Sequence, residues 1–295
     1  MRLIRKIIPA PVREIVNRLH AKYFRKMLFG YMDLADRLTA SPDDLAPPRK
    51  WAYNTGNVGG IRGIREGGIP EVEFIIETVG LARNEKVLDV GCGVGVKAIP
   101  LAKYMAGEGE YEGFDIVAEQ IAWLQQNVTP RFPNFRFLHA DIHNKWYNPS
   151  GKIGSSEYVF PYGDETFDFV FLISVFTHML PAEVENYLSE ISRVLKAGGR
   201  CFITYFLLDS ESMPIARKGI NGPEFKHEMN EYWVEDLEFP ETAVAYREEY
   251  IRGLYDRFGM SIKSPLVHGS WRGRQGARYY QDAIVGWKRE GVISR

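Results

Sequence analysis

The chain has 295 residues, of which 45% are hydrophobic and 25% charged, and its formal net charge at pH 7 is −1. This composition is typical of a folded globular protein and excludes a disordered or collagen-like chain. A nearly neutral charge also argues against a protein that binds nucleic acid over its whole surface, so we expect no nucleic-acid partner.

The cysteine pattern indicates the compartment. Cys92 and Cys201 are the two cysteines of the chain, which is too few for a disulfide framework, and neither a C-x-x-C nor a histidine-rich metal pattern is present. We therefore expect a cytoplasmic protein without a metal site. The apolar run at residues 169–176 is far shorter than the ~20 residues that span a membrane, so we interpret it as a central strand.

Residues 1–45 predict a basic, amphipathic, N-terminal helical extension. Apolar residues recur there at helical spacing, and residues 1–30 carry eight Lys or Arg against a single Glu. Two interpretations stay open. The apolar face packs on the rest of the protein, or the helix lies on an anionic membrane surface, which would place the protein peripherally at the inner face of the membrane.

A polar, proline-rich linker at residues 41–50 predicts a boundary, followed by one domain over residues 46–295. Residues 51–69 contain Trp51, Tyr53 and many glycines. We interpret this segment either as a lid over a ligand or as a plain surface loop. A helix is predicted at residues 70–79, since Pro70 suits a first helical turn.

From residue 86 onward the pattern alternates between strands and helices. Alternating β and α units of this length predict an α/β fold with a doubly wound, mostly parallel sheet, whose ligands bind at the carboxyl ends of the strands. The predicted strands are residues 86–90, 110–114, 136–139, 167–172 and 200–207, and the predicted helices are residues 96–104, 118–127 and 182–195.

The first strand leads directly into a glycine loop. Asp89, Gly91, Gly93 and Gly95 form a D-x-G-x-G-x-G run, in which Cys92 also lies. Glycine tolerates positive φ and lets a ligand approach the backbone closely, so we expect a nucleotide-like cofactor to contact these residues. The spacing fits neither the dinucleotide fingerprint, because Gly95 comes one place early, nor a Walker A loop, because no Gly-Lys-Ser/Thr follows.

Two further aspartates lie at the ends of the second and third predicted strands. Asp115, followed by Ile116, can accept hydrogen bonds from both ribose hydroxyls. Asp141 can accept from an adenine amine, while the N–H of Ile142 reaches a ring nitrogen. Each aspartate alone could equally be a turn or cap residue, but together with the glycine loop they predict a cofactor site. Ser174, after the fourth strand, is expected to line it.

The D-x-G-x-G-x-G run resembles motif I of the class I S-adenosylmethionine-dependent methyltransferases. LHADIHN, FDFVFLISVFTHML and EISRVLKAGGRCFIT, at residues 138–144, 167–180 and 190–204, resemble later motifs of that family in the correct order. The resemblance implies a seven-stranded, Rossmann-like methyltransferase fold, with residues 261–267 and 280–288 as the sixth strand and the antiparallel seventh. It also implies S-adenosyl-L-methionine as cofactor and S-adenosyl-L-homocysteine as product.

A hydroxyl acceptor must lose a proton during methyl transfer, and a general base assists this step. Two roles stay open for His178, just after the fourth strand: it acts as this base, or it caps a helix or binds a backbone carbonyl. YNPSG, SVFTHM and a late W-x-G-R…QD tract are similar to methyltransferases of bacterial sugar, polysaccharide or glycolipid synthesis. This similarity implies O-methylation of a small or lipid-linked acceptor, first of all a sugar hydroxyl.

Acceptor contacts are expected from Tyr53, His178, His227, Arg272 and Arg274. Arginine suits carboxylate or phosphate, although a solvated hairpin loop is the alternative for the last two. We interpret the long connection at residues 145–160 as a functional or mobile loop, and the insertion at residues 210–240 as a cover over the acceptor. Further contacts predicted in this insertion are Glu224, Tyr232 and Trp233.

Other functions stay open. One is methylation of a carboxyl, nitrogen or carbon atom of another metabolite, and another is a non-catalytic binding module that keeps the fold. A Rossmann oxidoreductase is disfavoured by Gly95 and Val96, and RNA or DNA methylation by the absence of a recognisable binding appendage or tetrad. The sequence does not predict the oligomeric state.

Overall fold

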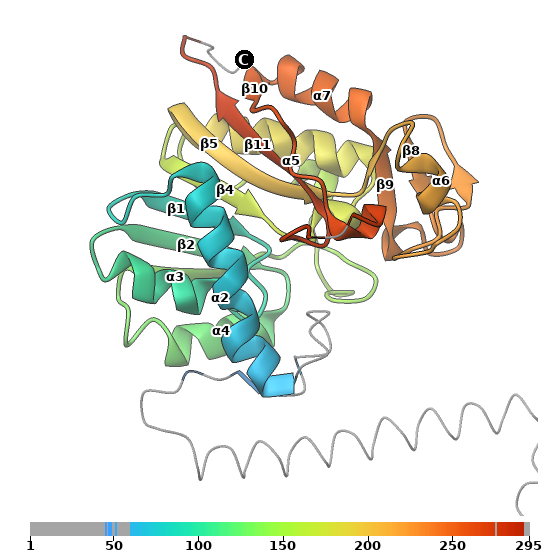
Figure 1. Ribbon diagram of the computed structural model, residues 1–295. Helices are drawn as coiled ribbons and strands as arrows, with labels where there is room; N and C mark the ends of the chain where they lie inside the picture. Colours follow the sequence, from blue (N-terminus) through green and yellow to red (C-terminus); the bar gives the residue numbers. More distant parts are fainter. Residues whose placement is uncertain (1–44, 46, 49–50, 52–59, 275, 292–295) are drawn as a thin grey trace, which may run out of the picture. The chain divides into compact units, whose positions relative to one another are not determined.

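The computed structural model describes residues 45, 47–48, 51, 60–274 and 276–291, and at residues 60–67 it describes the backbone alone (Figure 1). The chain forms two compact units, residues 1–67 and 68–295. The predicted basic helix, the membrane contact through residues 1–30 and Tyr53 lie outside the described residues. They remain predictions.

The second unit is built on a seven-stranded sheet in the order β10-β11-β5-β4-β1-β2-β3. β1 pairs in parallel with β2 and β4, whereas β11 pairs antiparallel with β5 and β10. The predicted doubly wound, mostly parallel sheet is thereby confirmed. The strands are β1 Lys86–Val90, β2 Glu110–Asp115, β3 Phe135–His139, β4 Phe167–Leu172, β5 Leu195–Tyr205, β10 Met260–Ile262 and β11 Asp282–Lys288.

Helices cover both faces of this sheet (Figure 1). α3 (Ala98–Met105), α4 (Ala118–Asn127) and α2 (Gly60–Val79) from Gly68 onward lie on one face, and α5 (Pro181–Val194) and α7 (Glu248–Arg257) on the other. Leu88 and Val90 of β1 share one buried cluster with Leu188 and Ile191 of α5 and Leu254 of α7. Because alternate strand residues face opposite sides, Asp89 points toward the face of α2.

A second sheet, in the order β6-β9-β8-β7, follows β5 along the chain. Its strands are β6 Leu207–Leu208, β7 His227–Glu228, β8 Tyr232–Val234 and β9 Val244–Arg247, joined by α6 (Met213–Ala216) and the 3₁₀ turn η5 (Pro240–Thr242). The insertion therefore has a core of its own, which includes Phe206, Phe225, Trp233 and Trp271. Trp233 is 1% exposed, so its predicted acceptor contact is wrong.

The connection between β3 and β4 is anchored rather than loose. Ile142 and Ile153 form a bridge, and a short 3₁₀ turn, η3 (Ser155–Glu157), follows. Tyr158 and Phe160 are buried in the core, and Asn186 of α5 donates to the carbonyl of Tyr158 at 2.9 Å. These bonds satisfy backbone groups that a buried loop would otherwise leave unpaired.

Two elements begin at least five residues before their predicted starts, and the predicted strand at residues 261–267 is shorter, as β10 (Met260–Ile262). β5 begins at Leu195 rather than at residue 200, because a register shift in its pairing with β4 lets the strand continue through Gly198 at φ 72°. α2 begins at Gly60 and contains Pro70, which we expected to start the helix. Gly68 explains how this helix packs, since an added Cβ would lie 2.1 Å from the carbonyl oxygen of Val96.

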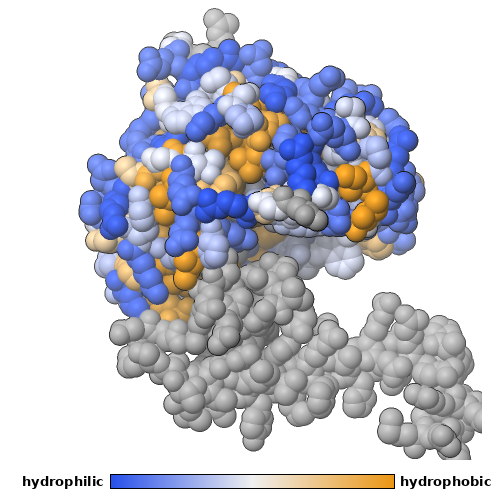
Figure 2. Space-filling model, viewed as in Figure 1, coloured by the Kyte–Doolittle hydropathy of each residue, from blue (hydrophilic) through white to orange (hydrophobic). Residues whose placement is uncertain are grey.

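The surface on one side is mixed in character. Figure 2 shows apolar side chains reaching this face in separate patches between polar ones. Among the residues that the structure describes, no helix has both the length and the apolar character needed to cross a membrane.

We expect Gly68→Ala to lower the free energy of unfolding by ~1–3 kcal/mol, because the new methyl group would force α2 away from Val96. Gly253→Ala is the matched control. Gly253 also lies inside a helix, α7, but its added Cβ would meet nothing within 4 Å, so a gain of ~0.5–1 kcal/mol is expected. Urea unfolding measures both; equal effects of the two changes would contradict the proposed close contact.

Candidate cofactor and active site

The glycine loop after β1 has the backbone that its sequence predicts. Gly91, Gly93 and Gly95 have φ values of 83°, 52° and 80°, which residues other than glycine rarely adopt. A Cβ on Gly91 would lie 2.5 Å from Cγ2 of Val175, and one on Gly95 would lie 2.5 Å from Cδ2 of Leu124. The loop is thus packed closely between α4 and the segment that follows β4.

Gly93 faces open space instead. The first atom that its Cβ would meet is Oε1 of Gln120, at 3.9 Å. Its N–H donates to Oδ2 of Asp115 at 2.8 Å, and the N–H of Val117 donates to Oδ1 at 2.9 Å. Each carboxylate oxygen of Asp115 keeps a further lone pair, so this group can still accept from ribose hydroxyls. Burial raises the pKa of Asp115 although these N–H groups favour its charged form.

Asp89 and Cys92 lie below the loop rather than on its open side. Asp89 is 3% exposed and accepts a hydrogen bond from the hydroxyl of Tyr111 at 2.6 Å. Burial raises the pKa of the Cys92 thiol well above its ordinary value, so the thiol stays protonated. The N–H groups of Gly91 and Cys92 both donate to the carbonyl of Phe114. These residues shape the loop from beneath.

At the end of β3 the prediction needs one correction. The N–H of Ile142 donates to the carbonyl of Ala140 at 2.8 Å and its side chain is 2% exposed, so the N–H expected to meet a ring nitrogen is already used. The carboxylate of Asp141 is about half exposed and lies 3.8 Å from Nζ of Lys152. Ile116 is half-buried, and its carbonyl lies 3.2 Å from Nε2 of His139.

Ser174, two residues after β4, connects three strands of the sheet. Its φ is 57°, a left-handed backbone conformation that residues other than glycine rarely adopt. Its N–H donates to Oγ1 of Thr204 on β5 at 2.8 Å, and its hydroxyl donates to Oε1 of Gln281 at 3.0 Å. Gln281 in turn donates to Oγ1 of Thr177 at 3.4 Å. The sequence analysis did not predict Gln281 or Thr204. A polar residue within an apolar strand, such as Thr204, or just before one, such as Gln281, could have indicated a buried hydrogen bond.

His178 ends the 3₁₀ turn η4 (Phe176–His178), three residues after Val175, whose side chain touches Gly91. Its Nδ1 lies 2.9 Å from the carbonyl oxygen of Glu241 in η5. A carbonyl can only accept, so we assign the ring proton to Nδ1, which leaves a lone pair on Nε2. The side chain is exposed, and Nε2 has no hydrogen-bond partner among the described residues.

The expected role of Arg272 as an acceptor contact is wrong. Its side chain is 2% exposed and donates to Asp282 at 2.7 Å, to Asp209 at 2.6 Å and to the carbonyl of Leu207 at 2.9 Å. A buried guanidinium needs such partners to offset its loss of hydration, and at 2% exposure the side chain has almost no surface that a ligand could contact. Arg274 is about half exposed and pairs with Glu211 at 2.8 Å.

The remaining predicted contacts lie in the second sheet or, for Glu224, just before its strand β7. His227 belongs to β7, where it pairs with Val234 of β8. Tyr232 is half-buried against Tyr246, and Glu224 forms an ion pair with Lys226 at 3.0 Å. Their acceptor contacts stay predictions.

The raised pKa of Asp89 predicts that the free energy of unfolding depends on pH. Burial raises this pKa from 3.8 to about 7, so between about pH 4 and pH 7 the native protein holds a proton that the unfolded chain has released. The free energy of unfolding therefore falls as pH rises, by up to ~1.4 kcal/mol per pH unit from this group.

Asp89→Asn can still accept from Tyr111 but cannot titrate. We expect the free energy of unfolding of this variant, relative to that of the unchanged protein, to increase from pH 4 to pH 7. Urea unfolding measures it. Asp256→Asn is the control, because the side chain of Asp256 is 82% exposed. A stability difference that does not change with pH would refute the raised pKa.

Comparison with known proteins supports this geometry. Residues 87–199 match the family model described as a methyltransferase domain. This stretch runs from β1 into β5 and includes the glycine loop, Asp115, Ser174 and His178. The inserted sheet, Arg272 and Arg274 lie outside the match.

Two curated relatives are similar over this region. An uncharacterized protein of Haemophilus influenzae is 31% identical over 137 residues, which cover 46% of this chain and 48% of that protein. A demethylmenaquinone methyltransferase of Lactiplantibacillus plantarum is 36% identical over 120 residues, covering 41% of this chain and 44% of that protein. The chain thus spans about half the length of the curated relatives it matches.

A solved structure shares the fold over a longer stretch. The Burkholderia thailandensis 1,6-didemethyltoxoflavin-N1-methyltransferase, determined with bound 1,6-didemethyltoxoflavin and S-adenosylhomocysteine, has a TM-score of 0.50 and 16% sequence identity, and the similarity covers 85% of this chain and 94% of that one. Residues 87–199 of this chain therefore match a methyltransferase domain, and the sheet that carries them has the fold of this solved methyltransferase structure.

Proposed function

We propose that this chain transfers a methyl group from S-adenosylmethionine to a hydroxyl of a small or lipid-linked acceptor, and that this hydroxyl belongs to a sugar. The observation that carries the proposal is the arrangement at the carboxyl edge of the sheet. A loop that is open at Gly93 lies beside Asp115, and the same loop contacts Val175, which leads into the turn that holds His178.

The residues present fit the cofactor. Asp115 would accept from the ribose hydroxyls, Asp141 would accept from the adenine amine, and the open backbone at Gly93 leaves room for the atoms between them. When bound, S-adenosylmethionine supplies a methyl group activated by the sulfonium and leaves as S-adenosylhomocysteine. The chain itself then needs to hold the acceptor in line and to accept its proton.

His178 is our candidate for the proton acceptor. The carbonyl of Glu241 fixes the ring through Nδ1, so Nε2 presents its lone pair and would take the proton of the acceptor hydroxyl. Once the ring is protonated, the same carbonyl still accepts from Nδ1, which stabilises the cation. A carboxyl acceptor would need no such base.

A neutral acceptor agrees with the charges near this edge. Arg272 is buried and paired with Asp282 and Asp209, and Arg274 is paired with Glu211. A phosphate or carboxylate would therefore have to compete with these carboxylates for either arginine. The sugar itself rests on the resemblance described above. Contact with a membrane through residues 1–30 remains a separate prediction.

We expect Asp115→Ala to weaken binding of S-adenosylhomocysteine at least ~100-fold, because two hydrogen bonds to a charged acceptor are lost. Titration calorimetry with S-adenosylhomocysteine and with its 2′,3′-dideoxy analogue measures the effect. The unchanged protein should prefer the natural ligand strongly, and the variant should not discriminate.

Asp168→Ala is the matched control for this experiment. Asp168 also accepts from a backbone N–H, that of Lys86 at 2.8 Å, but it lies at the amino edge of the sheet, so its loss should leave cofactor affinity unchanged. Equal discrimination between the two ligands by the protein and by Asp115→Ala would remove Asp115 from the ribose. Absence of any binding to the unchanged protein would refute the proposed function.

For His178 we expect both His178→Asn and His178→Ala to lower turnover at least ~100-fold with little change in KM. Asn can replace Nδ1 as donor to Glu241 but offers no base at the position of Nε2. Methyl transfer to neutral glycosides, followed across pH, provides the readout, and the acidic limb of the rate profile should disappear. If Asn restores turnover where Ala does not, the histidine has only a structural role.

A further inference from the structure

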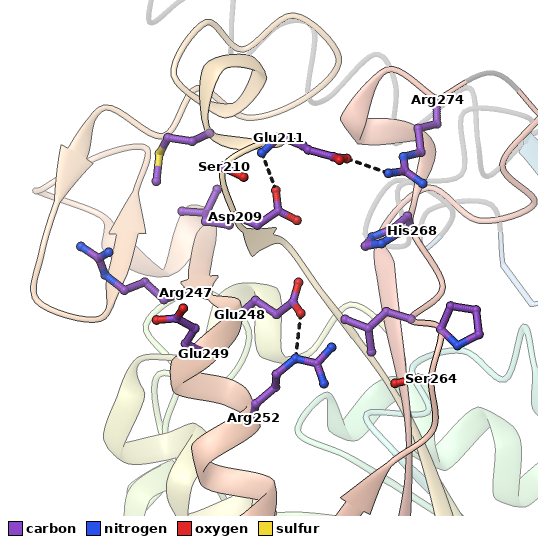
Figure 3. Close-up of a pocket in the computed structure, with 14 residues that line it drawn as sticks. Asp209, Ser210, Glu211, Arg247, Glu248, Glu249, Arg252, Ser264, His268 and Arg274 are labelled. Carbon is purple, nitrogen blue, oxygen red and sulfur yellow. Dashed lines mark hydrogen bonds and ion pairs between the residues drawn. The ribbon is translucent and has the colours of Figure 1, made fainter.

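A cavity of about 900 Å³ lies apart from the glycine loop, where the ends of β6 and β9 approach α7 and the segment before β11 (Figure 3). Its wall contains both charged and apolar side chains. The residues that line it are Leu208, Asp209, Ser210, Glu211, Met213, Arg247, Glu248, Glu249, Arg252, Ser264, Pro265, Leu266, His268 and Arg274.

The cavity and the methyl-transfer site lie on two sides of the start of β11. Gln281 contacts Ser174 and Thr177, whereas the next residue, Asp282, lies 3.8 Å from the ring of His268 in the cavity wall. Successive side chains of an extended segment point to opposite sides, which separates the two sites by little more than the strand itself.

The arginines of the wall already have partners. Arg274 pairs with Glu211 at 2.8 Å, Arg252 with Glu248 at 2.7 Å, and Arg247 with Glu228 at 3.0 Å. Figure 3 shows the first two of these pairs facing the cavity. Because each of these guanidinium groups already has a carboxylate partner, an anionic ligand would have to compete with that carboxylate for it.

Hydrogen-bond acceptors, by contrast, are free. The exposed carboxylate of Glu249 has no ion pair or hydrogen bond among the described residues. Nδ1 of His268 is buried without a hydrogen-bond partner, 3.8 Å from Oδ1 of the fully buried Asp282. A carboxylate on that side favours the proton on Nδ1, so Nε2 is left as an acceptor.

We propose that this cavity binds a neutral, hydroxyl-rich ring, namely a glycosyl unit of an extended acceptor at some distance from the hydroxyl that is methylated. Hydroxyls of the ring donate to Glu249 and to Nε2 of His268, and its C–H face packs on Pro265 and Leu266. This inference deepens the proposed function and rests on it for the reaction that the bound ring serves.

Saturation-transfer NMR on the full chain, without cofactor, tests the proposal. The probes are neutral methyl glycosides of glucose, mannose, galactose and rhamnose, with glucose 6-phosphate and spermidine as charged comparisons. We expect at least one neutral glycoside to bind more tightly than either charged probe. Preference for the phosphate or the polyamine, or no glycoside binding, overturns the proposal.

Two variants locate the binding. Glu249→Gln and His268→Ala should each weaken the glycoside at least ~5-fold, the loss of about one hydrogen bond to the wall. Glu238→Gln, a change at an exposed glutamate outside the cavity, should have no effect. Binding that survives both cavity variants places the sugar elsewhere and overturns the proposal.

The result is independent of the reaction. If glycosides bind here but none is methylated, the proposed function fails and the glycosyl site stands. If glycosides are methylated while binding ignores Glu249 and His268, the function stands and the glycosyl site fails. Unchanged S-adenosylhomocysteine affinity and melting temperature show that each variant is folded.

Discussion

The active edge depends on the absence of two side chains in the glycine loop. Val175 occupies the place that a Cβ of Gly91 would take, and Leu124 does the same at Gly95. Through these contacts the loop fixes both helix α4 and the entry to η4. Because protein interiors are close-packed, a shift at either contact is transmitted rather than absorbed. The relative positions of Asp115 and His178 therefore follow from the packing of the loop.

A second constraint joins the inserted sheet to the central one. Asp282, the first residue of β11, accepts from the N–H of Leu207, the indole of Trp271 and the guanidinium of Arg272. Removing one partner from such a buried network would leave an uncompensated charge, so its members stay together. The network fixes β6 and the segment before β11. It thereby fixes the position of Gln281 on one side and of the cavity on the other.

The sequence predicted what depends on local pattern. The bounds of β1, β4 and α4 were found as expected, because apolar runs and helical periodicity are set by neighbouring residues. The start of α2 and the early start of β5 depend on contacts made across the fold, and so were missed. The same holds for the site. The places of Gly93 and Asp115 could be predicted from their spacing in the sequence. The ion pairs of Arg272 could not, because its two aspartate partners lie 63 and 10 positions away.

Residues 87–199 and the residues that follow them contribute different groups to the candidate site. The part matched by the methyltransferase domain carries the glycine loop, Asp115 and His178, and the part after residue 199 carries the inserted sheet, Arg272 and Arg274. There Arg272 and Arg274 are both paired with carboxylates. An anionic acceptor that took Arg272 from Asp282 would leave a buried carboxylate unpaired, which costs several kcal/mol. Hydroxyls need no such exchange, since they can donate to carboxylates that remain paired. If this part meets the acceptor, as we propose, its charge pairing would favour a neutral acceptor over an anionic one.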